Sequence, residues 1–117
     1  SLPVQKTIIM NIITEKEADK LIQAARNCKK DDRLNEKLSP LQYDEAIKSQ
    51  DPMKLLHLVR CLYNIKNERA KDLRKMKSAD GRMLQAARKL LYGELAVALG
   101  LEHSEVCSQM DEFLGQN

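Results

Sequence analysis

One stretch, residues 78–99 (SADGRMLQAARKLLYGELAVAL), constrains the fold more than any other part of this chain. Its apolar side chains recur at steps of three and four residues, which places them on one face of an α-helix. Ser78 is predicted to cap the start, Asp80 complements the helix dipole, and Gly100 stands where a left-handed cap ends a helix. The predicted apolar face consists of Met83, Leu84, Ala87, Leu90, Leu91, Leu95, Ala98 and Leu99. A helix with so long an apolar face needs other helices to cover it.

Composition limits the remaining possibilities. A length of 117 residues favours one domain, and with one Phe, three Tyr and no Trp its core must be largely aliphatic. The longest apolar runs are far shorter than the roughly 20 residues of a membrane-spanning helix, and we find no secretory signal. Cys28, Cys61 and Cys107 are odd in number and widely spaced, which fits a reducing compartment. We therefore expect a cytoplasmic protein without a membrane partner.

Three further helices are predicted from their N-terminal signals. Thr14 and Glu17 have the spacing of a capping box, in which each side chain bonds the other residue's backbone N–H. Ser39 and Asp51 are cap residues followed directly by Pro, which favours the first helical position. The helices predicted in this way span residues 14–29, 39–49 and 51–68.

The helix over residues 51–68 has a wide apolar face, so we expect it to be largely buried. His57, Arg60, Cys61 and Asn64 are predicted to lie on its other side. A last short helix is predicted over residues 103–114. The fold class is therefore all-α: a compact bundle of about five helices, preceded by a short extended segment. We expect residues 14–117 to form the helical domain and residues 1–13 to lie outside it.

Motifs that would carry catalysis are scarce. The sequence has no Gly-rich phosphate loop, no HExxH and no CxxC. His57 with Cys61, and His103 with Cys107, share a four-residue spacing that would point each pair the same way, and four such ligands could bind zinc. Nothing in the sequence brings the two pairs together, so we favour ordinary surface and core roles. We expect no enzyme activity, no metal and no cofactor.

Charge is distributed unevenly along the chain. Residues 60–89 hold ten basic and three acidic side chains, whereas residues 90–117 hold five acidic and no basic ones. One interpretation is contact with phosphates, because Lys and Arg neutralise the nucleic-acid backbone and release its counterions. The other is a solvated helix face that keeps the protein soluble. Charge alone does not decide between them.

The segment MLQAARKLLYGELA, residues 83–96, resembles the signature helix of CarD/CdnL-type bacterial transcription regulators. Leu58-Val59-Arg60 is similar to the "VVR" helix of that family, and residues 2–4 are similar to the last strand of its N-terminal domain. The resemblance implies that residues 1–13 are the tail of an N-terminal domain that binds the RNA polymerase β subunit. It also implies that the helical domain lies against promoter DNA and regulates transcription without catalysis.

The chain departs from the family in one important feature. Family members carry a Trp near the second helix that wedges into the minor groove, but this chain has no Trp and its matching residues are 35–37. The resemblance then leaves DNA backbone contacts of low sequence specificity to basic side chains. The predicted DNA-binding residues are Lys66, Arg69, Lys71, Arg74, Lys75, Lys77, Arg82, Arg88 and Lys89.

An alternative is a helical protein–protein interaction module without DNA binding. In that case an exposed helix face binds a partner protein or a second copy of the chain. An apolar side chain left exposed on the second or last helix would favour this alternative.

Overall fold

A computed structural model describes residues 13–117 of the chain. This part contains five α-helices, one short 3₁₀ turn and no strand, which confirms the predicted all-α fold. The short extended segment expected before the helical domain, within residues 1–13, lies outside the described residues apart from Ile13, which is buried. The helices are α1 (Glu15–Arg26), α2 (Pro40–Ser49), α3 (Pro52–Lys71), α4 (Ser78–Leu99) and α5 (His103–Leu114), and the 3₁₀ turn is η2 (Cys28–Lys30).

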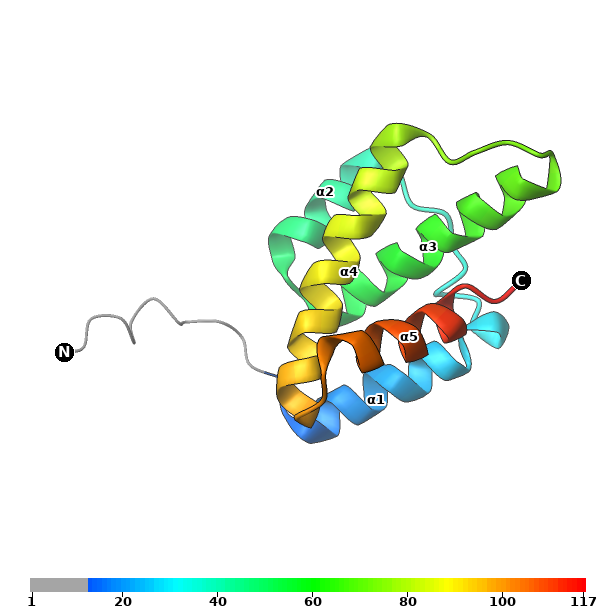
Figure 1. Cartoon of the computed structure of the whole chain (residues 1–117). Helices are drawn as coiled ribbons and strands as arrows, with labels where there is room; N and C mark the ends of the chain where they lie inside the picture. The colour runs from blue at the N-terminus through cyan, green and yellow to red at the C-terminus, as the bar shows by residue number, and fades with distance from the viewer. Residues whose placement is uncertain (1–12) are drawn as a thin grey trace.

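Helix α4 is the centre of the bundle and packs against α1, α2, α3 and α5. Helices α1 and α5 lie side by side across its C-terminal end, α2 lies beside its N-terminal half, and a loop joins α3 to α4 (Figure 1). None of the helices in the described part of the chain is long and apolar enough to cross a membrane.

The predicted face of α4 forms its contact with the core. Leu84, Ala87, Leu91 and Leu95 are buried, and the other predicted members are half-buried. The sequence argument missed Tyr92, whose side chain has no exposed surface. A tyrosine is buried this deeply when its hydroxyl has a hydrogen-bond partner, and the contacts of Tyr92 below supply one.

Most of the predicted helix caps are present. Thr14 Oγ1 accepts from the Glu17 N–H at 3.0 Å, and the Thr14 N–H donates to the Glu17 carboxylate at 2.8 Å. Ser39 forms the same capping box, Asp51 accepts from a backbone N–H of α3, and Gly100 is left-handed at φ 64°. These interactions are local, so the sequence predicts them well.

Ser78 is not the cap of α4, contrary to the prediction. Lys77 holds that position in an extended conformation, and its side chain makes no capping bond. The Gly81 N–H already donates to the Lys77 carbonyl at 2.9 Å, so helical bonding begins one residue earlier and places Ser78 inside the helix. The N-terminus of α4 therefore lacks a side-chain cap.

The prediction that Arg60 and Cys61 lie on the outward side of α3 is also wrong, because each is only 3% exposed. Arg60 Nε donates to Asn35 Oδ1 at 2.8 Å, and its Nη1 donates to the carbonyls of Leu114 at 2.9 Å and Gln116 at 2.6 Å. The chain after η2 and the end of α5 therefore cover the side of α3 that we expected to face solvent. A buried guanidinium keeps its donors satisfied there by binding carbonyl and amide oxygens.

Candidate nucleic-acid interface

The loop between α3 and α4, residues 72–77, begins with an ordered turn. Leu73 is left-handed at φ 58°, the Leu73 N–H donates to the Ala70 carbonyl at 3.0 Å, and the Arg74 N–H donates to the Arg69 carbonyl at 2.9 Å. This pair of bonds is the Schellman motif, which satisfies the last carbonyls of a helix. Helix α3 thus continues to Lys71, beyond the end predicted near residue 68, and then reverses direction.

A side-chain contact fastens the loop back onto α3. Arg69 Nε donates to the Lys75 carbonyl at 2.6 Å. The loop then leads from the free end of α3 to the start of α4 along the outer edge of the molecule (Figure 1). Its basic side chains are therefore held on a defined backbone.

Seven of the nine predicted DNA-binding residues are exposed, and none of the seven forms a salt bridge within the described part of the chain. Arg69 is half-buried but keeps both of its terminal amino groups outside the contact with Lys75. Lys89 lies about two turns beyond Arg82 along α4. We leave Lys89 out for this reason, and Arg88 is treated separately below. The other seven predicted residues are called the connector surface: Lys66, Arg69, Lys71, Arg74, Lys75, Lys77 and Arg82.

Arg88 does not belong to the connector surface, although the sequence placed it on the outer face of α4. Its Nε and Nη2 donate to the two carboxylate oxygens of Asp111 on α5, at 3.0 and 2.5 Å. Tyr63 of α3 and Tyr92 of α4 donate their hydroxyls to the same carboxylate, at 2.9 and 2.8 Å. These four residues are called the Asp111 cluster: Tyr63, Arg88, Tyr92 and Asp111. The cluster links α3, α4 and α5, and it pairs the Arg88 guanidinium with a carboxylate.

The pKa values of the Asp111 cluster reflect this arrangement. Burial raises the pKa of the Asp111 carboxyl, but the hydrogen bonds from Arg88, Tyr92 and Tyr63 outweigh it, so the net pKa lies below the ordinary value. Burial, together with the neighbouring carboxylate, raises the pKa of both tyrosines. The cluster is therefore a charged carboxylate held by one guanidinium and two neutral phenols at neutral pH.

The two His–Cys pairs stay apart in the described residues. His57 Nε2 lies 3.0 Å from the Glu36 carbonyl while Cys61 is buried, and burial raises the pKa of the Cys61 thiol. Cys107 Sγ and His103 Nδ1 lie 3.4 Å apart on α5. No group of three or more metal-ligating side chains is brought together in the part of the chain that the structure describes.

The fold and the connector surface define a small helical domain with an ordered basic edge, whose side chains form no salt bridge within residues 13–117. The sequence model of the family described as CarD, C-terminal domain matches residues 9–111, and the chain belongs to this family. This confirms the family that the segment at residues 83–96 indicated. Comparison with curated proteins and comparison with solved structures each give no match.

Proposed function

We propose that this domain acts in transcription by binding the DNA backbone through the connector surface, beside RNA polymerase. Membership of the CarD C-terminal domain family supports a transcription-related role. The observation that carries the DNA contact is the ordered loop between α3 and α4, whose basic side chains are exposed and free of salt bridges within residues 13–117. Charges held on a fixed backbone lose less conformational freedom when they meet phosphates.

Binding of this kind is electrostatic and largely independent of sequence. Each phosphate that the connector surface neutralises releases counterions, so the logarithm of the affinity falls linearly with the logarithm of the salt concentration. The side chains of Lys71, Arg74 and Lys75 are exposed at the turn itself and form no salt bridge within the described residues. They are the best positions at which to test the proposal.

We expect the triple variant Lys71→Gln, Arg74→Gln, Lys75→Gln to bind duplex DNA more weakly for every sequence tested. The salt slope should decrease by about 0.9 for each phosphate contact that is lost. Fluorescence anisotropy with labelled duplex and forked DNA across a salt series measures both quantities.

The matched control is Lys16→Gln, Lys20→Gln, Lys48→Gln, which removes three exposed charges from α1 and α2. Both variants have the same net charge, so a difference between them reports the location of the charge. Equal binding by the two variants contradicts the connector surface as the DNA-binding site. Unchanged circular dichroism spectra establish that both variants are folded.

A protein-interaction module is the second candidate, and one observation favours it. Leu41 on α2 is 73% exposed, which leaves an apolar side chain on the second helix in contact with solvent. Exposed apolar side chains that form part of a larger patch mark contact sites, whereas single ones are common. The wild-type chain distinguishes the two candidates, because an interaction module shows no DNA binding even at low salt.

A further inference from the structure

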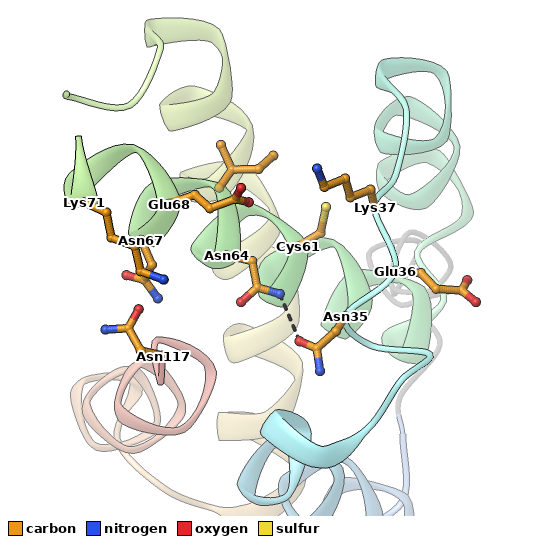
Figure 2. Close-up of a pocket in the computed structure, with 10 residues that line it drawn as sticks. Asn35, Glu36, Lys37, Cys61, Asn64, Asn67, Glu68, Lys71 and Asn117 are labelled. Atoms are coloured by element: carbon orange, nitrogen blue, oxygen red, sulfur yellow. Dashed lines mark hydrogen bonds between the residues drawn. The ribbon is translucent and has the colours of Figure 1, made fainter. Parts of the chain in front are cut away.

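We propose that a pocket between α3 and residues 35–37 binds an unpaired guanine base, in a single-stranded nucleic acid or in a free nucleotide. This proposal rests on the proposed nucleic-acid binding and names a base that the domain recognises. The pocket has a volume of about 220 Å³, and α3 forms one of its walls with Asn64, Asn67 and Glu68 (Figure 2). It lies next to the connector surface, because Lys71 belongs to both.

The orientation of one amide beside the pocket is fixed by its neighbours. A guanidinium can only donate hydrogen bonds, so the Asn35 atom that faces Arg60 Nε at 2.8 Å must be the oxygen. The Asn35 nitrogen then donates to the carbonyls of Cys28 at 2.9 Å and Asp31 at 2.8 Å, which accept only. Every contact of this amide agrees with that assignment.

The fixed amide determines what the pocket offers to a ligand. Asn64 Nδ2 donates to Asn35 Oδ1 at 2.9 Å, so the Asn64 oxygen lies on the side away from Asn35 (Figure 2). Asn67 Nδ2 donates to the Gly115 carbonyl at 3.1 Å, which leaves its oxygen as an acceptor too. Within residues 13–117 no protein donor bonds either oxygen or the exposed carboxylate of Glu68. The α3 side of the pocket therefore presents the acceptor oxygens of Asn64, Asn67 and Glu68 beside the ammonium donor of Lys71.

The charges that line the pocket and its volume limit the class of ligand that it can bind. The exposed residues Lys37 and Lys71 lie on opposite sides of the pocket (Figure 2), and the exposed residues Glu36 and Glu68 line it as well, so these four charges balance. Lys71 also belongs to the connector surface, which favours a ligand that carries a phosphate beside the pocket. The volume is below the roughly 300–1,000 Å³ of pockets for drug-sized ligands, so a single flat ring system is the appropriate size.

A ligand with donors on a flat ring and a phosphate attached is a nucleotide. Guanine presents two adjacent donors on its Watson–Crick edge, the ring N1–H and the exocyclic amino group, whereas adenine and cytosine present only an amino group there. One carboxylate can accept from both donors of guanine, and such paired hydrogen bonds discriminate strongly between bases. The geometry assigns this role to Glu68, with the oxygens of Asn64 and Asn67 beside it.

The test compares two labelled thymine oligonucleotides that carry either one central guanine or one central adenine. We expect the wild-type chain to bind the guanine strand about tenfold more tightly by fluorescence anisotropy. Glu68→Gln should reduce this ratio to nearly one, because an amide cannot accept both donors. Glu45→Gln, at an exposed position on α2, is the matched control: it removes the same charge and should keep the ratio.

The outcomes separate this proposal from the proposed function. Equal binding of both strands by the wild type, or an unchanged ratio in Glu68→Gln, overturns the pocket while duplex binding by the connector surface still stands. If neither strand binds, duplex DNA measured separately decides the proposed function, and guanosine monophosphate alone then tests the pocket through the side-chain amide NMR signals of Asn64 and Asn67. Unshifted signals in that experiment overturn it.

Competition identifies the source of the base. Displacement of the guanine strand by guanosine monophosphate, but not by adenosine monophosphate, supports the pocket and indicates a free nucleotide as ligand. A guanine preference that neither mononucleotide reduces supports recognition within a single strand, where the connector surface adds its phosphate contacts.

Discussion

The connector surface and the Asp111 cluster use basic residues from the same stretch of sequence in opposite ways. Arg82 is exposed and forms no salt bridge in the described part of the chain, whereas Arg88, less than two turns further along α4, is bound by Asp111. Both arginines are equally basic. A positive charge is therefore open to a ligand only where no carboxylate from another helix reaches it.

The largest effect is expected at the centre of the Asp111 cluster. Asp111→Ala should lower the free energy of unfolding by about 3 kcal/mol, because it leaves the Arg88 charge and the hydroxyls of Tyr63 and Tyr92 without their acceptor. Urea denaturation followed by circular dichroism measures the change. Glu112→Ala, at the neighbouring exposed position, is the control and should stay within about 0.5 kcal/mol of the wild type.

The pH dependence of the same variant sharpens this result. The pKa of Asp111 is lower in the folded state, so its contribution is complete above the unfolded pKa and is lost as the pH falls through the folded pKa. The stability difference between wild type and Asp111→Ala should therefore be constant near neutral pH and decrease below about pH 4. A difference that does not change in acid would show that the carboxylate charge has no part in the effect.

Single substitutions of Arg88 and Arg82 should separate an effect on folding stability from an effect on DNA binding. Arg88→Ala should cost about 1–3 kcal/mol of stability and leave DNA affinity unchanged, since its guanidinium is bound within the fold. Arg82→Ala should leave stability within about 0.5 kcal/mol and lower the salt slope of DNA binding by up to about 0.9. Denaturation and anisotropy on both variants give the four values. Loss of DNA affinity in a folded Arg88→Ala variant would show that Arg88 belongs to the DNA-binding surface.

The smallest effect concerns the backbone of the connector. Leu73 is 95% exposed and left-handed, a conformation that costs a residue with a side chain roughly 1–2 kcal/mol. Leu73→Gly removes this cost but adds flexibility to the unfolded chain, about 0.5–1 kcal/mol in the opposite direction. We expect a net stabilisation of about 0.5 kcal/mol, seen as a small rise in the midpoint of thermal unfolding. A lower midpoint would show that the Leu73 side chain itself supports the turn.

The sequence by itself determined the helices and most of their ends. The caps at Thr14, Ser39, Asp51 and Gly100 were predictable because each involves residues within a few positions of one another. The core face of α4 followed from its periodicity, and the family from the segment at residues 83–96. The exposure of most of the basic residues also followed, since lysine and arginine side chains favour water.

Only the tertiary structure decided which charges and polar groups are already engaged. Periodicity identifies an apolar face, but it does not show that the opposite side of α3 is covered as well, so Arg60 and Cys61 were misplaced. The partners of Arg60 on α5 and of Arg88 at Asp111 are 54 and 23 residues away along the chain. The orientation of the Asn64 amide in the pocket likewise depends on Asn35, 29 residues before Asn64. Contacts over such separations form only when the helices pack, so no local pattern in the sequence encodes them.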